Sequence, residues 1–216
     1  MIRAVIFDMD GVMIDSEVLY RRACTEIVLE HGGRISTELF EKQMGLKMEE
    51  TQRVVVEVAG LPMTPEIFGR EYIRKFLSIA RKELRPNPGL IELLDFLSSR
   101  VLLGIASSTE RAVVLELVDQ IGAREFFNAI VGGDEIGPSK PDPSIYLRAA
   151  QLLGVLPEEC IVIEDSPNGI KSGTSARMKV LAVRHEENRN LDLSAAYRVF
   201  ENLHEVMSYL ENSLVR

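Results

Sequence analysis

The chain has 216 residues, of which 46% are apolar, and it carries a formal net charge of −8. This length allows one large domain, or one domain that carries an inserted module. The apolar runs are far shorter than the ~20 residues of a transmembrane helix, so no membrane span is expected, and the acidic balance disfavours a nucleic-acid partner, which would require clustered Lys and Arg.

Five short segments are apolar nearly throughout, which is typical of strands buried on both faces of a parallel sheet. In chain order they are residues 3–7, 101–106, 128–132, 160–164 and 179–183. Amphipathic patterns predict helices over residues 110–121 and 144–153 between the later strands, and a closing helix over 202–215. Strands that alternate with helices predict βαβ units and an open α/β sheet.

Residues 16–85 interrupt this alternation with a pattern that is helical throughout. Apolar residues recur at helical spacing, first at Leu19, Ala23 and Ile27 and later at Phe68, Tyr72, Phe76 and Ala80. The segment is far longer than an ordinary loop between a strand and a helix. We therefore expect an all-helical module inserted after the first strand, with the Pro- and Gly-rich residues 85–89 as the return point.

Polar residues follow the predicted strands directly. In an open α/β sheet, ligands bind beyond the carboxyl ends of the strands, so these residues are candidates for one site. In chain order they are Asp8 and Asp10, then Ser107, Ser108 and Thr109, then Lys140, and finally Glu164, Asp165 and Ser166. If the strands are neighbours, four carboxylates, several hydroxyl groups and one lysine converge.

Converging carboxylates repel one another unless a cation lies between them. Oxygen ligands without His or Cys indicate a hard metal, so Mg²⁺ is the expected cofactor. A lysine and hydroxyl groups facing the same cation would bind an anion, for which phosphate is the obvious candidate. Residues i and i+2 of a strand face the same way, so Asp8 and Asp10 can both project into this site, and Gly11 then permits a sharp turn.

The two aspartates can divide the work of phosphoryl transfer. Asp8 is the predicted nucleophile and a Mg²⁺ ligand, and its attack on phosphorus would give an aspartyl-phosphate. Asp10 is the predicted acid that protonates the leaving alcohol and the base that later activates water. Lys140 and the backbone N–H groups around Met9 and Ser108 would stabilise the transferring phosphoryl group.

Four motifs of the chain together resemble those of the haloacid dehalogenase-like hydrolases, in the branch with a helical cap. They are DMDG at residues 8–11, Ser107 after an apolar strand, Lys140 within SKPDP, and IEDSPNGI at residues 163–170. Each motif alone is weak, but the four stand in family order across nearly the whole chain. The resemblance implies a Rossmann-like parallel sheet in an α/β catalytic core of residues 1–15 and 86–216, with residues 16–85 as an inserted helical cap domain.

The resemblance also implies roles for the matching residues. The two aspartates would be the nucleophile and the acid/base, and Ser107 and Lys140 would bind phosphate. The implied Mg²⁺ ligands are Asp8, the backbone carbonyl of Asp10, and Asp165, with Glu164 as a further ligand or as a partner that acts through water. A dehalogenase needs neither Mg²⁺ nor a second aspartate, so this set favours a phosphatase that hydrolyses phosphoric monoesters.

Substrate choice is expected to depend on the cap. The sequence DSE at residues 15–17, followed by Leu19, resembles sugar-phosphate phosphatases and their mutase relatives, so the expected substrate is a small phosphorylated metabolite, a sugar phosphate. The related β-phosphoglucomutases carry a histidine where this chain has Tyr20, which argues against the alternative of a phosphomutase. The loop around Gly45 would close over the site, and Lys47 is either a contact to a polar substrate or a solvated surface lysine.

Two hypotheses of another class stand beside the enzyme. A receiver domain also binds Mg²⁺ and phosphorylates an aspartate, but that aspartate follows its third strand and it has no cap. A family member that has lost activity and only binds phosphate is the other.

The remaining expectations concern residues outside the motifs. Cys24 and Cys160 lack metal-site spacing and are expected to be buried thiols. His31, His185 and His204 fall in no motif and are expected to be exposed to solvent. The apolar start of the chain is interrupted too early for a signal peptide, so we expect a cytoplasmic protein, as a monomer or weak homodimer.

Overall fold

The computed structural model describes residues 1–42 and 48–214, and the chain divides into two compact units. The first unit combines Met1–Asp15 with Leu84–Arg216, and the second is Ser16–Glu83. Among the described helices, none has the length and apolar character needed to cross a bilayer.

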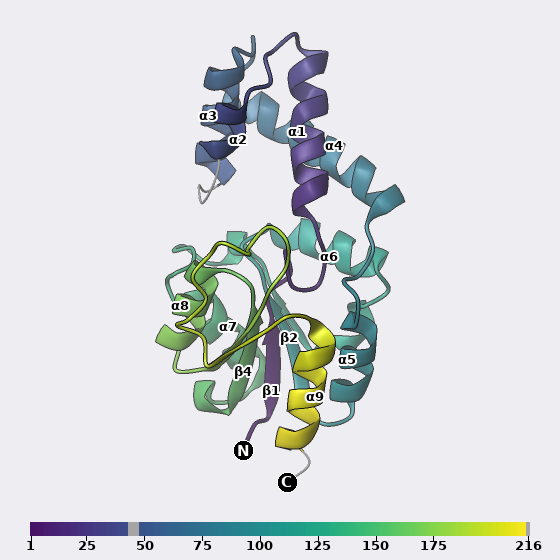
Figure 1. Ribbon diagram of the computed structural model, residues 1–216, viewed down its shortest axis with the longest axis vertical. Helices are drawn as coiled ribbons and strands as arrows, with labels where there is room; N and C mark the ends of the chain where they lie inside the picture. Colours follow the sequence, from purple (N-terminus) through teal and green to yellow (C-terminus); the bar gives the residue numbers. More distant parts are fainter. Residues whose placement is uncertain (43–47, 215–216) are drawn as a thin grey trace. The chain divides into compact units, whose positions relative to one another are not determined.

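The first unit is built on a parallel sheet, to which the described residues contribute six strands in the order β3-β2-β1-β4-β5-β6. The strands are β1 (Ala4–Phe7), β2 (Leu102–Ala106), β3 (Ala129–Val131), β4 (Cys160–Glu164), β5 (Lys179–Val183) and β6 (Arg198–Phe200). The chain extends the sheet to one side of β1 and then crosses to the other side, so the order reverses at β1 (Figure 1). Ligands of such sheets bind at this reversal point, beyond the strand ends.

The five predicted strands are confirmed, with bounds that differ from the prediction by one residue at most. The sequence pattern missed β6, a three-residue edge strand that pairs with β5 and begins at the exposed Arg198. Its pairing with β5 makes it a strand, and only Phe200 of its three residues is buried. The fold is therefore of the α/β class that the sequence predicts, and its sheet has one strand more than the five predicted.

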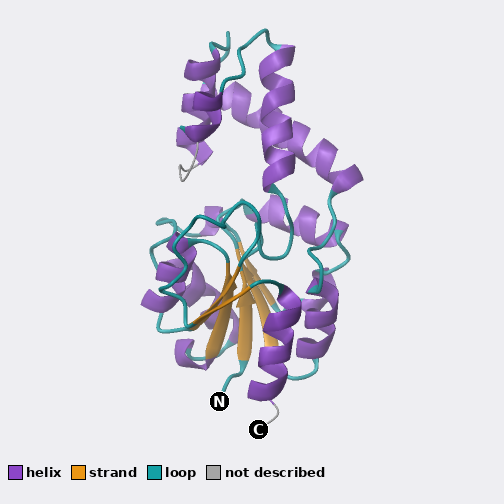
Figure 2. Ribbon diagram, in the orientation of Figure 1, coloured by secondary structure: helices purple, strands orange, loops and turns teal. Residues whose placement is uncertain are grey.

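Helices cover both faces of the sheet (Figures 1 and 2). Their bounds are α5 (Leu90–Ser98), α6 (Arg111–Gln120), α7 (Ser144–Leu153), α8 (Pro167–Ser175) and α9 (Leu203–Leu214), with short 3₁₀ turns η1 (Arg124–Phe126), η2 (Gly133–Glu135) and η3 (Pro157–Glu159). α7 and α8 lie on one face, where Ala4, Ile6 and Val162 form a buried cluster with Tyr146 and Ile170. Because strand side chains alternate, every second strand residue points toward α7 and α8.

The second unit contains α1 (Glu17–Glu30), α2 (Thr37–Glu41), α3 (Met48–Ala59) and α4 (Pro65–Glu83), and α1 packs against α4. The predicted apolar stripes of residues 19–27 and 68–80 are confirmed, because each of their members is buried. The ring of Tyr20 stacks on that of Phe76, with centroids 3.7 Å apart. Gly45 and Lys47, the predicted substrate contacts of this unit, lie outside the described residues.

Candidate active site

The backbone of the predicted site residues is fixed by hydrogen bonds that continue the sheet beyond its strands. The amide of Asp8 donates to the carbonyl of Ile163 at 2.9 Å, and the amide of Ser107 donates to the carbonyl of Val131 at 3.1 Å. Each bond links the end of one strand to its neighbour in the sheet. The residues directly after β1 and β2 are therefore held by the same kind of hydrogen bond as the strands.

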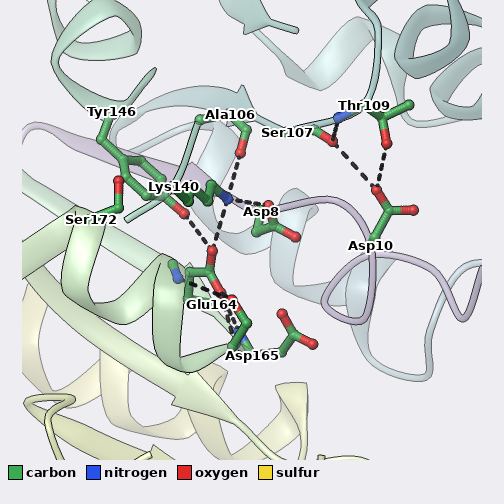
Figure 3. A network of polar contacts seen from close by, with 12 residues as sticks. Asp8, Asp10, Ala106, Ser107, Thr109, Lys140, Tyr146, Glu164, Asp165 and Ser172 are labelled. Atoms are coloured by element: carbon green, nitrogen blue, oxygen red, sulfur yellow. Dashed lines mark hydrogen bonds and ion pairs between the residues drawn. The ribbon is translucent and has the colours of Figure 1, made fainter. Parts of the chain in front are cut away.

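Lys140 joins the carboxyl ends of three neighbouring strands (Figure 3). Its Nζ forms an ion pair with Asp8 Oδ1, lies 2.8 Å from Glu164 Oε1, and donates to the carbonyl of Ala106 at 3.1 Å. The side chains of Lys140 and Asp8 are only 7% and 10% exposed. Buried charges in proteins are typically paired, and here two carboxylates pair with Lys140.

Glu164 is turned toward the protein with both of its oxygens. Oε1 accepts hydrogen bonds from Lys140 and from the Tyr146 hydroxyl, the latter at 2.9 Å. Oε2 accepts from the amides of Asp165 and Ser166 and from the Ser166 hydroxyl, at 2.8–3.0 Å. A carboxylate with this many protein donors is better suited to hold Lys140 than to coordinate Mg²⁺, so we do not retain Glu164 among the candidate metal ligands.

Asp10 lies among hydroxyl groups, in an environment unlike that of Asp8. Its Oδ2 accepts a hydrogen bond from Thr109 Oγ1 at 3.0 Å and lies 3.4 Å from Ser107 Oγ (Figure 3). The Ser107 hydroxyl also accepts the Thr109 amide at 3.1 Å. After Asp10 the chain turns at Gly11, whose φ of +80° is rarely adopted by residues with a side chain.

The other predicted phosphate contacts are backbone groups. Met9 is fully buried, and its carbonyl accepts hydrogen bonds from the amides of Met13 and Ile14. Ser108 is exposed, beside the loop that follows β3.

Asp165 follows β4 and is partly buried, with 16% of its side chain exposed. Its Oδ2 lies 2.8 Å from Nε2 of His185. His185, which is predicted to be exposed, is only partly so, with 28% of its side chain exposed. A Cβ atom added to Gly11 would lie 2.3 Å from the same Asp165 oxygen, so the turn after Asp10 must be glycine for Asp165 to occupy its position.

The electrostatics of the site reflect an excess of negative charge. Burial raises the pKa of Asp8 well above its usual value, although Lys140 opposes this shift, and burial raises the pKa of Asp165 to about 6. Burial would raise the pKa of Glu164 too, but Lys140 and the hydrogen bonds to Glu164 hold that pKa below its usual value. Burial would lower the pKa of Lys140, yet Asp8 and Glu164 keep it well above its usual value, so the lysine stays charged.

The candidate donors for a metal are oxygen atoms, which fit Mg²⁺. Asp8 and Asp165 follow the adjacent strands β1 and β4, and each carboxylate has a raised pKa that a nearby cation would lower. In the described part of the chain, no three His, Cys, Asp or Glu side chains form a complete cage for a metal. Mg²⁺ tolerates such a site because it commonly retains several waters and is held by one or two carboxylates.

Comparison with known proteins identifies the family. The family model described as haloacid dehalogenase-like hydrolase matches residues 5–183. A phosphorylated carbohydrates phosphatase of Thermotoga maritima is 33% identical over 187 residues, which cover 86% of this chain and 87% of the relative. Hexitol phosphatase B of Escherichia coli is 33% identical over 199 residues, covering 88% and 86%.

A crystal structure of a β-phosphoglucomutase candidate from Thermotoga maritima superimposes with a TM-score of 0.86 and 31% identity, covering 99% of this chain and 100% of that one. The chain thus belongs to the haloacid dehalogenase-like hydrolase family, as its motifs predict. Phosphatases of this family generally use Mg²⁺.

The structure brings together most of the residues that the motifs single out: Asp8, Asp10, Ser107, Lys140, Glu164 and Asp165. Three polar residues that the sequence did not single out also belong to this network, namely Tyr146, His185 and Asn188. Each contacts the site through its side chain, Tyr146 from α7 and the other two from the loop after β5. Of the three, only Tyr146 sits close to a motif, six residues after Lys140.

Proposed function

We propose that this protein is a Mg²⁺-dependent phosphatase that hydrolyses a small phosphorylated carbohydrate through an aspartyl-phosphate on Asp8. The observation that carries the proposal is the buried Lys140, which pairs with Asp8 after β1 and with Glu164 at the end of the adjacent strand β4. The relatives named as phosphatases of phosphorylated carbohydrates and of hexitol phosphates support the substrate class.

Each residue has a role that its surroundings support. The Asp8 carboxylate attacks phosphorus and displaces the alcohol, while Lys140 offsets the charge of the nucleophile and of the phosphoryl oxygens. Asp10 gives its proton to the leaving oxygen, and the ionised Asp10 then takes a proton from the water that attacks the aspartyl-phosphate. Ser107 and Thr109, which follow β2, hold the Asp10 carboxylate in place.

The metal would be held by Asp8, Asp165 and the Asp10 carbonyl. When bound, Mg²⁺ would neutralise charge on the phosphoryl oxygens and orient the group for in-line attack. In the helical unit, Ser16–Glu83, we propose a cap that selects the substrate, with Gly45 and Lys47 as candidate contacts.

The test is a panel of sugar and hexitol phosphates assayed for phosphate release with Mg²⁺ and with EDTA. We expect release that depends on Mg²⁺ and that falls by at least about 10³-fold in Asp8→Asn, because this change removes the nucleophile. Asp119→Asn, which alters an exposed aspartate of α6, is the matched control and should leave the rate unchanged. Phosphate release that survives Asp8→Asn would contradict the assignment of the nucleophile.

The runner-up is a phosphomutase, and the same panel separates it from a phosphatase. A mutase would convert β-glucose 1-phosphate to glucose 6-phosphate with little release of phosphate. Tyr20 occupies the position where the resemblance expects a mutase histidine, and its ring packs on Phe76 within the helical unit. This packing supports a structural role for Tyr20 and favours hydrolysis.

A further inference from the structure

The loop that follows β5 is shaped by its own polar side chains. The guanidinium of Arg184 donates to the carbonyls of Asn188, Arg189 and Leu191 at 3.1–3.3 Å. These bonds fold the loop into a tight curve that starts directly at the end of the strand. The curve brings residues 185 and 188 back toward the end of β4.

Asn188 attaches this loop to the candidate site through the backbone. It is 2% exposed, and its Nδ2 donates to the carbonyls of Asp165 and Val183, each at 2.9 Å. Its Oδ1 accepts the amide of His185 at 2.9 Å. One buried amide thus bridges the end of β5, the residue after β4, and the backbone of His185.

His185 completes the attachment through a side chain. Its Nε2 lies 2.8 Å from Asp165 Oδ2, with 28% of the histidine side chain exposed. An ionised carboxylate can only accept hydrogen bonds, so Nε2–H donates to it. The same oxygen faces Gly11, where an added Cβ would lie 3.1 Å from His185 Nε2. Asp165 is therefore confined between the turn after Asp10 and the loop after β5.

We propose that residues 184–191 form a positioning loop for Asp165, in which Asn188 fixes the backbone and His185 fixes one carboxylate oxygen, so that the other is presented to the metal. This inference rests on the proposed function, because it assigns Asp165 to Mg²⁺. A carboxylate whose rotation is already restricted loses less freedom on binding a cation. Partners that orient a metal ligand in this way are typically worth about 10–100-fold in metal affinity or activity.

The decisive variants are at His185, because its side chain is partly exposed and its replacement leaves the loop backbone intact. Asn188→Ala would remove three hydrogen bonds of a buried side chain and disturb the loop itself. It therefore does not separate a loss of Asp165 positioning from a loss of loop structure. His185→Phe keeps a planar ring and removes the donor. His185→Gln restores an N–H donor near the original Nε2 position.

A matched control exists in the helical unit. His31 Nε2 lies 2.9 Å from Glu71 Oε2, and its side chain is 34% exposed, which closely resembles the His185 pair. His31→Phe therefore makes the same chemical change at a comparable pair that the proposal does not involve.

The experiment measures the Mg²⁺ dissociation constant by calorimetry without substrate, the Mg²⁺ dependence of phosphate release, and the urea midpoint in EDTA. For His185→Phe we expect an approximately 10-fold or greater loss of Mg²⁺ affinity. Saturating Mg²⁺ should restore most of the rate, and the urea midpoint in EDTA should change little. His185→Gln should recover most of the affinity, and His31→Phe should match the wild type.

Two results would overturn the inference: Mg²⁺ affinity in His185→Phe equal to that of the wild type, or an equal loss in the Gln variant that keeps the donor. Failure of the proposed function looks different. In that case Asp165→Asn would bind Mg²⁺ as the wild type does, or the wild type would bind none.

Discussion

The hydroxyl of Tyr146 gives the most direct test of the buried network around Lys140. Tyr146 is fully buried on α7, its hydroxyl donates to Glu164 Oε1 at 2.9 Å, and its ring centroid lies 4.8 Å from Lys140 Nζ. Tyr146→Phe removes only the hydroxyl, since the ring, its packing and its contact with the lysine all remain. Any change in stability then reports the contacts of this one hydroxyl with Glu164 and Lys140.

The expected magnitude follows from the partners that stay. A hydrogen bond to a charged acceptor contributes about 1.5–3 kcal/mol net. Glu164 Oε1 keeps its contact with Lys140 at 2.8 Å, so the carboxylate is not left without a donor, and we expect the lower end, about 1.5 kcal/mol. For a chain of this size each kcal/mol corresponds to about 2–4 °C in Tm, so Tm should fall by about 3–6 °C.

The assay is urea unfolding followed by circular dichroism, with ΔG obtained by linear extrapolation. Tyr197→Phe is the control, because that ring is 62% exposed and the same atom is removed at the surface. It should change ΔG by less than about 0.5 kcal/mol. If Tyr146→Phe also changed ΔG by less than about 0.5 kcal/mol, the hydroxyl would not be holding Glu164, and the network as described would be wrong.

Three further outcomes follow from the same structure. Gly169→Ala should destabilise the protein by more than about 2 kcal/mol in urea unfolding and also lower the rate, because the added Cβ would lie 1.6 Å from Glu164 Oε1; a ΔG equal to that of the wild type would contradict this close approach. In a Cys24→Ser background, Cys160 should resist a disulfide reagent at pH 8 until urea unfolds the chain, because burial raises the pKa of this thiol to about 11. The reactivity of Cys160 should rise about tenfold per pH unit toward that pKa. Rapid labelling of the folded chain at pH 8 would show that the thiol is accessible. Lys140→Met should abolish phosphate release and also lower the free energy of unfolding, since it leaves Asp8 and Glu164 buried without their cation. A fully active variant would remove the lysine from the mechanism.

The sequence predicts the sheet well because its strands are buried on both faces. A strand covered on both sides must be apolar at nearly every position, and such runs are visible without any knowledge of the partners. β6 lacks this signal, since a three-residue strand at the sheet edge begins with the exposed Arg198. Only its pairing with β5 makes it a strand, and the pairing partner of a short segment cannot be read locally.

The candidate site is predictable where its residues follow strands and unpredictable where they reach it from elsewhere. Tyr146 lies on an amphipathic helix where an apolar-facing tyrosine looks like ordinary core, and its hydroxyl has meaning only once Glu164 is known to face it. His185 and Asn188 belong to a loop without a motif. The way the loop curves depends on the hydrogen bonds that Arg184 makes to three carbonyls, and spacing does not encode these bonds.

The alternation of β4 explains which way Glu164 faces. Cys160 and Val162 face the cluster beneath α7 and α8, so Glu164, two residues further along β4, points toward the same side. There it meets Tyr146 and Lys140. Asp165 lies beyond the end of the strand and turns the other way, so adjacent carboxylates in the sequence have separate partners in the structure.

The two aspartates of the DMDG motif differ for a related reason. Asp8 continues the alternation of Ala4 and Ile6, which places it on the side of Lys140, where burial disfavours its charge and the lysine opposes that effect. Asp10 lies past the last strand residue, among hydroxyl donors and nearer to solvent. The proposed nucleophile must remain ionised in a dry site, whereas the proposed acid/base must exchange protons with alcohol and water. The charge partner of Asp8 and the hydroxyl partners of Asp10 therefore suit opposite tasks, although the two side chains are chemically identical.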